Sequence, residues 1–79
     1  MSETFLEEFG ERLKYLRKNR DLTQREVAAI LNCSYNMISG YELGKRSPDL
    51  LTLVKLCDFY DVSADYLLGR LSQSKIKLK

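Results

Sequence analysis

The side chains that could do chemistry in this chain are amides, hydroxyls and cations, while the usual catalytic set is missing. The 79 residues include no histidine, and the two cysteines, Cys33 and Cys57, lie far apart. Neither a zinc site nor a histidine-assisted nucleophile can be assembled from this inventory, and no glycine-rich phosphate loop is present. We therefore expect no enzyme activity, no metal and no cofactor, and we interpret both cysteines as reduced core thiols.

Charge is distributed unevenly along the chain, although the net charge is only +2. Four acids, Glu3, Glu7, Glu8 and Glu11, come first. A basic run follows, opposed only by Asp21, and it comprises Arg12, Lys14, Arg17, Lys18, Arg20 and Arg25. Lys45 and Arg46 form a second basic spot. Such clustering is consistent with a polyanionic partner, and the alternative interpretation is an ordinary solvated helix face.

Length and composition indicate one small folded domain. Hydrophobic residues make up 44% of the chain and charged residues 30%, which is typical of a globular protein with a packed core. No apolar run approaches the roughly 18 to 20 residues that a membrane span needs, and the acidic start is unlike a secretory signal. We expect a cytoplasmic protein without membrane association.

Hydrophobic periodicity and capping residues position the first two helices. A first helix is predicted over residues 4–19, and a second begins at Thr23, which forms a capping box with Glu26. The apolar residues of the two inner faces are Phe5, Phe9, Leu13, Leu16, Val27, Ala28 and Leu31. Asn32 tolerates a left-handed backbone, so the second helix is expected to end there.

Three further helices follow, and no sheet is expected. Ser34 caps a third helix through about Leu43, Gly44 terminates it, and Ser47 or Asp49 caps the fourth. The predicted apolar face of the fourth helix consists of Leu50, Leu53, Val54, Leu56, Cys57 and Tyr60. Residues 61–63 turn into a short fifth helix that ends before Gly69, and residues 75–79 alternate with a period of two, as an extended strand would.

Only about three residues separate the second and third helices. Two helices joined by so short a turn, inside a small all-helical domain, suggest the helix-turn-helix arrangement, in which the second helix of the pair enters the DNA major groove.

From Leu22 to Gly69 the sequence resembles the Cro and phage-repressor (Xre) family of DNA-binding domains. The matching residues are Leu22, Thr23, Gln24, Val27, Ala28, Leu31, Ser34, Ile38, Ser39, Tyr41, Glu42, Gly44, Pro48, Leu53, Val62, Ser63, Tyr66, Leu67, Leu68 and Gly69. The resemblance implies an all-α fold, a compact five-helix lambda-repressor-like domain with a recognition helix over residues 34–43. It also implies a transcriptional regulator, more often a repressor, that binds a palindromic operator as a dimer.

The resemblance further assigns a structural ion pair to Arg17 and Glu42. Arg17 follows Leu13 by four residues and Glu42 follows Ile38 by four, so both charges lie beside apolar helix faces. In the family the corresponding residues link the first helix to the third, and here the pair would fix how the recognition helix projects.

Helical geometry selects the candidates for reading bases. With Ile38, Tyr41 and Glu42 turned inward, the outward residues are Tyr35, Asn36, Ser39, Gly40 and Leu43. Asn36 matches the edge of adenine, Ser39 suits either kind of base, and Tyr35 suits a thymine methyl or a phosphate. Many relatives carry a long side chain where Gly40 stands, and Gly40 offers only backbone or room for close approach. Met37 borders the core and is expected to pack.

Phosphate contacts are expected from Gln24 at the positive end of the second helix and from Lys45 and Arg46 beside the third. Arg25 and Lys18 would add long-range attraction to DNA or remain solvated.

Dimerisation is predicted through the fifth helix, because Tyr66, Leu67, Leu68 and Leu71 exceed the apolar needs of so short an element. Residues 1–71 would form the helix-turn-helix domain. Residues 72–79 would form a tail that is either disordered or an extended strand in contact with the second copy. No small-molecule substrate is evident.

The main alternative is a partner-binding module, such as an antitoxin or an adaptor for another regulator. Residues 34–43 contain neither lysine nor arginine, so the commonest guanine contact cannot come from the recognition helix itself. Gln24, Lys45 and Arg46 favour DNA, because a surface that only binds protein would not need a phosphate-binding frame.

Overall fold

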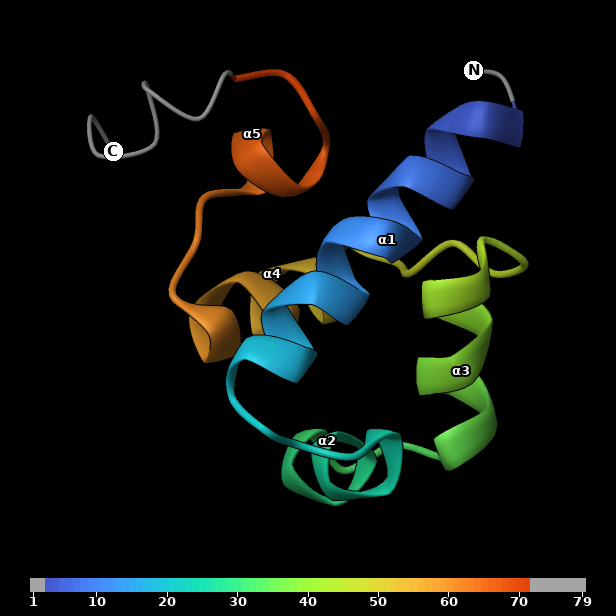
Figure 1. Cartoon of the computed structure of the whole chain (residues 1–79), viewed down its shortest axis with the longest axis vertical. Helices are drawn as coiled ribbons and strands as arrows, with labels where there is room; N and C mark the ends of the chain where they lie inside the picture. Colours follow the sequence, from blue (N-terminus) through green and yellow to red (C-terminus); the bar gives the residue numbers. More distant parts are fainter. Residues whose placement is uncertain (1–2, 72–79) are drawn as a thin grey trace.

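Five helices form the described part of the chain, residues 3–71, in a computed structural model (Figure 1). The helices are α1 (Glu3–Asn19), α2 (Gln24–Leu31), α3 (Tyr35–Leu43), α4 (Leu50–Tyr60) and α5 (Ala64–Leu67). No strand occurs within residues 3–71. The predicted all-α fold class is therefore confirmed, while the predicted tail, residues 72–79, lies outside the described residues.

Local side-chain chemistry explains where the helices begin and end. Thr23 accepts from the backbone N–H of Glu26, and the Glu26 carboxylate accepts from the N–H of Thr23, so the predicted capping box is present. Ser34, Asp49 and Ser63 cap the next three helices, each by accepting one backbone N–H from the third residue of its helix. The choice between Ser47 and Asp49 thus falls on Asp49, whose carboxylate accepts from Thr52 N–H at 2.8 Å.

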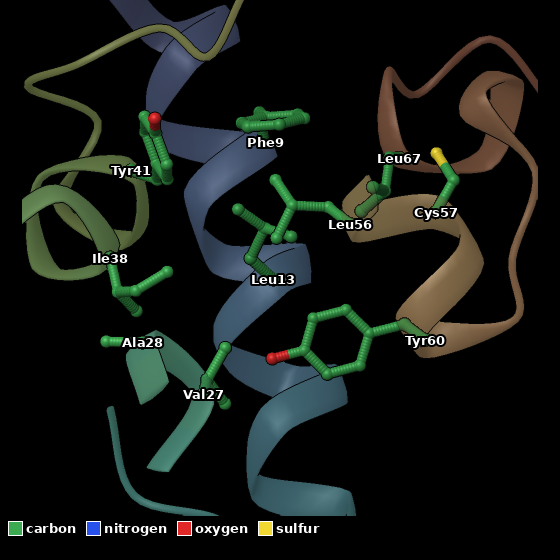
Figure 2. Packing of buried hydrophobic residues seen from close by; sticks show 10 residues of the cluster. All are labelled: Phe9, Leu13, Val27, Ala28, Ile38, Tyr41, Leu56, Cys57, Tyr60 and Leu67. Carbon is green, nitrogen blue, oxygen red and sulfur yellow. The ribbon is translucent and has the colours of Figure 1, made fainter. Parts of the chain in front are cut away.

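The core gathers around α1, which runs through the middle of the molecule with α3 on one side and α4 on the other (Figure 1). Figure 2 shows the buried side chains from all five helices meeting there. They are Phe9, Leu13, Val27, Ala28, Ile38, Tyr41, Leu56, Cys57, Tyr60 and Leu67. Met37 packs against this cluster as expected. Both cysteines are free thiols, Cys57 buried and Cys33 half-buried, and burial raises the pKa of each.

A glycine permits the close approach of α1 and α3. At Gly10 an added Cβ would lie 2.4 Å from the carbonyl oxygen of Glu42 and 2.6 Å from that of Tyr41. Both are backbone atoms held in a helix, so they have no room to retreat. Gly10 therefore allows the short distance between α1 and α3. No sequence motif predicted this close contact.

The outer face of α4 departs from the prediction. Leu53, Leu56, Cys57 and Tyr60 pack inward, but Leu50 is 81% exposed and Val54 54% exposed, with Leu51 beside them at 65%. The apolar stripe was predicted too broad, because α4 contacts the core along one side only. The prediction for α5 also differs from the structure. Leu67 was expected to contribute to an apolar dimer surface, but it is fully buried in the core.

Three of the cations in the basic run serve the fold. Arg17 pairs with Glu42, Arg12 donates to the carbonyl oxygen of Leu67 at 3.1 Å, and Arg20 donates to that of Phe59 at 2.8 Å. The Arg20 guanidinium also lies over the Phe59 ring, 5.5 Å from its centroid. These arginines tie α1 to the other helices, so the basic run overstates the charge available to a partner. None of the helices within residues 3–71 is long and apolar enough to cross a membrane.

Candidate nucleic-acid interface

The turn between α2 and α3 fixes the angle of the two helices. Asn32 adopts the left-handed conformation at φ 57° and ψ 48°, and its backbone N–H reaches back to α2. Cys33 N–H then donates to the carbonyl oxygen of Ala28 at 2.9 Å, and Ser34 caps α3 through Met37 N–H at 3.1 Å. These hydrogen bonds are all made within the turn or to the adjoining helix ends, so the turn fixes the direction of α3 relative to α2.

One face of α3 is buried and the opposite face is open. Ile38, Tyr41 and Glu42 are buried, and Figure 2 shows Ile38 and Tyr41 pointing into the core. The open face carries the predicted base-reading residues, of which Tyr35 and Asn36 are exposed and Ser39 and Gly40 half-buried, with Leu43 at 59% exposure. A single helix thus presents an amide, a hydroxyl and a phenol on one outward surface.

A buried ion pair holds this helix against α1. Arg17 Nε donates to Glu42 Oε2 at 2.7 Å and Arg17 Nη2 to Oε1 at 3.0 Å, while Nη1 donates to the carbonyl oxygen of Leu22 at 2.8 Å. The bond to Glu42 raises the pKa of Arg17 above its ordinary value. The guanidinium thus makes two parallel hydrogen bonds to the Glu42 carboxylate. Two bonds fix both the position and the rotation of α3 at Glu42.

Gln24 joins the same carboxylate. Its Nε2 donates to Glu42 Oε1 at 2.9 Å, and the side chain is half-buried between α2 and α3. The amide is thus held in place by the fold, and its second N–H is directed by that bond. Sequence reasoning placed Gln24 at the start of α2 but gave no signal that it completes the Arg17–Glu42 group.

Arg25 and Tyr35 bring the first turns of α2 and α3 together. The guanidinium carbon of Arg25 lies 4.5 Å from the centroid of the Tyr35 ring, within cation–π distance. Tyr35 therefore offers its free ring face and its hydroxyl, and Arg25 is held beside it rather than trailing in solvent. The sequence contains no spacing rule that predicts this contact, because it depends on the angle between two helices.

The loop after α3 folds back onto the helix. The N–H groups of Lys45 and Arg46 both donate to the carbonyl oxygen of Gly40, at 2.9 and 3.1 Å, while Gly44 takes the left-handed conformation at φ 77°. Lys45 and Arg46 are exposed. The loop thus sets two cations at the carboxyl end of the recognition surface.

An acidic groove borders the same region. Glu7, Glu8 and Glu11 of α1 line an open depression of about 490 Å³, whose other walls include Gln24 and Leu43. Lys14 also lines the depression, so its charge is mixed but mainly acidic. Arg25, Lys45 and Arg46 are exposed cations at the start of α2 and after the end of α3.

An all-helical domain whose third helix is turned outward on a short, capped turn is of the helix-turn-helix class. The helix-turn-helix family model matches residues 13–67, and the chain belongs to that family. Several relatives that share this domain are named HTH-type transcriptional regulators.

Relatives and solved structures agree with this assignment. Over 66 residues the chain is 48% identical to the HTH-type transcriptional regulator ImmR of Bacillus subtilis, a stretch that covers 84% of this chain and 52% of that protein. The controller protein C.AhdI of Aeromonas hydrophila superposes with a TM-score of 0.72 at 31% identity, covering 78% of this chain and 94% of that one. The DNA-binding domain of BldD superposes with a TM-score of 0.73 at 26% identity, covering 85% of this chain and 97% of that one. The chain spans about half the length of the curated relatives it matches.

Proposed function

We propose that this chain binds double-stranded DNA sequence-specifically as a transcriptional regulator, acts in the cytoplasm, and represses by occupying a palindromic operator. The observation that carries the proposal is the outward face of α3, which exposes Tyr35 and Asn36 on a helix locked in position by the Arg17–Glu42 pair. A rigid, solvent-facing helix of nine residues fits the width of the major groove.

Asn36 is the leading base-reading residue. Its exposed amide supplies one donor and one acceptor, the pattern that matches N7 and N6 of adenine. Ser39 follows on the same face and allows a hydroxyl contact. Gly40 lies on that face as well, but the Arg46 side chain fills the space beside its Cα, so a close approach to the Gly40 backbone is taken up within the fold. Tyr35 lies at the first turn, where its ring and hydroxyl suit a thymine methyl or a phosphate.

Gln24, Lys45 and Arg46 form the phosphate frame of the proposal. Gln24 is held at the amino-terminal end of α2, where the helix dipole and unpaired N–H groups attract anions. Lys45 and Arg46 stand at the other end of the recognition surface. Two anchoring points on either side of α3 would set its depth and register in the groove.

The operator form of the proposal requires two copies, because one recognition helix spans only a few base pairs. The surface proposed for the dimer is α5 and the residues after it, where Tyr66, Leu68 and Leu71 remain partly exposed. The exposed Leu50, Leu51 and Val54 of α4 offer a second apolar surface for the same purpose. Charged substitutions separate the two, since Leu71→Asp should give monomers by light scattering if α5 carries the dimer. Leu50→Asp should do so if α4 carries it.

Selection from a random duplex library at about 0.15 M salt tests the function. The expected result is enrichment of a palindrome whose half-sites lie about one helical turn apart, bound with a steep salt dependence. A reporter gene with that palindrome across its promoter should then fall in expression when the protein is present. Absence of any enriched sequence, with weak binding to every duplex, contradicts the proposal and favours a partner-binding module.

A further inference from the structure

Arg46 differs from the other arginines in the described part of the chain. Arg12, Arg17 and Arg20 donate hydrogen bonds within the fold, Arg25 lies over Tyr35, and Arg70 lies 3.6 Å from Asp65. Within residues 3–71, no hydrogen bond or ion pair engages the guanidinium of Arg46, and the residue is exposed. Its head group is therefore available to a ligand.

The stem of Arg46, by contrast, is seated on the recognition helix. A Cβ built on Gly40 would lie 2.6 Å from Cδ of Arg46, 2.9 Å from its Cγ and 3.3 Å from its Cβ. The side chain therefore crosses α3 through the space that a side chain at position 40 would fill. The backbone holds it there, because the N–H groups of Lys45 and Arg46 both donate to the Gly40 carbonyl oxygen.

This seat lies on the outward face of α3. Position 40 is one turn beyond Asn36 and three residues before Leu43, and both of these are exposed. The guanidinium begins one bond beyond Cδ, so it starts from this face of α3, and its charge also acts on the Tyr41 phenol. Residues 34–43 contain no lysine or arginine of their own, and Arg46 supplies the missing cation from the loop.

We propose that Arg46, rather than completing the phosphate frame with Gln24 and Lys45, is a specificity-determining residue that reads guanine in the major groove, and that Gly40 is the positioning residue that admits its side chain across α3. The inference rests on the proposed function. An arginine with both terminal nitrogens free is matched to O6 and N7 of guanine, which accept two parallel hydrogen bonds. A seated stem reduces the rotamer freedom lost on binding, so the contact should be selective as well as attractive.

A double-mutant cycle on the selected duplex tests the pair, with Lys45→Ala as matched control. Lys45 is a cation of the same loop whose bond to Gly40 comes from the backbone N–H, which alanine keeps, whereas the atoms nearest a Cβ at position 40 belong to the Arg46 side chain. Arg46→Ala should lower affinity about 5- to 100-fold and abolish preference for guanine at one position in each half-site. Gly40→Ala should fold, because the atoms nearest the added Cβ all belong to the side chain of the exposed Arg46 and none to the backbone. It should lower affinity by a similar factor in the wild-type chain and not at all in the Arg46→Ala chain. The loss of binding free energy caused by Gly40→Ala should add fully to the loss caused by Lys45→Ala.

The outcomes separate the inference from the function. If the wild-type protein selects no duplex, the proposed function and this inference both fail. If it selects one, but Arg46→Ala weakens all sequences alike with guanine preference intact, Arg46 contacts phosphate and the inference alone is wrong. Full additivity of Gly40→Ala with Arg46→Ala overturns the role of Gly40.

Discussion

Gln24 and Arg17 bond to the same carboxylate, because the Gln24 amide and the Arg17 guanidinium both donate to Oε1 of Glu42, at 2.9 and 3.0 Å. A residue proposed to touch DNA is thereby held by the pair that anchors the recognition helix to α1. The position of α2 relative to α3 and the position of α3 relative to α1 are set at one buried group. Because both bonds end on one carboxylate oxygen, the effects of Gln24 and Arg17 substitutions on stability should be coupled and not additive.

Gln24→Ala should weaken binding to every duplex by a similar factor while leaving the salt dependence unchanged, because glutamine is neutral and releases no counterion. Loss of its half-buried bond to a carboxylate should cost about 1 to 2 kcal/mol of unfolding free energy. Titration of matched and scrambled duplexes at several salt concentrations checks the first effect, and urea unfolding checks the second. A change in base preference would contradict the phosphate role.

Arg17→Ala should lower the unfolding free energy by about 3 to 5 kcal/mol, since it leaves the Glu42 carboxylate buried without its counter-charge. Replacing both partners with apolar residues, Arg17→Met with Glu42→Leu, should recover part of that loss because no lone charge remains. Urea unfolding followed by circular dichroism measures both. A loss below about 1 kcal/mol for Arg17→Ala would show that the pair is not what holds α3.

Asn36→Ala and Lys45→Ala should fail in different ways. Asn36→Ala should lower the binding free energy by about 1 to 3 kcal/mol on the selected site, because it removes a base contact. It should have little effect on a duplex in which the base that Asn36 reads has been replaced. The second should weaken all sequences alike and reduce the slope of log affinity against log salt by about 1. Equal losses on every duplex for Asn36→Ala would refute its base-reading role.

Tyr60 should make the fold sensitive to alkali. Burial raises the pKa of Tyr60 to about 12, with a smaller contribution from the Glu42 charge, whereas the ordinary value is 10.0. Between these values the native state keeps a proton that the unfolded chain releases. The contribution is therefore complete below pH 10 and lost as pH rises toward 12, at a cost of about 2 to 3 kcal/mol.

Urea unfolding across pH 8 to 12 checks this, with Tyr60→Phe as the test variant and Tyr15→Phe, at an exposed tyrosine, as control. Tyr60→Phe should unfold with a shallower alkaline slope than the wild type. Some slope should remain, since burial also raises the pKa of Tyr41 and of both cysteines. An unchanged slope in Tyr60→Phe would contradict the prediction.

Local chemistry was enough to predict the helices and their ends. Thr23, Ser34 and Asn32 act on backbone groups within a few residues, so their effects can be recognised in a short stretch of chain. The resemblance added the pairing of Arg17 with Glu42, which spans 25 positions and which no local rule contains. Residue spacing also indicated which face of α3 would be open.

Tertiary structure alone decided which cations are free and which apolar residues are exposed. Arg12 and Arg20 look like DNA-binding charges in the sequence, yet each donates to a carbonyl more than 35 residues away. Leu50 and Val54 look like core residues, yet α4 turns them to solvent. Arg46 crosses Gly40 because a loop reverses direction between them. Charge and hydrophobicity are properties of the residue type, whereas availability depends on neighbours that only packing of distant segments brings together.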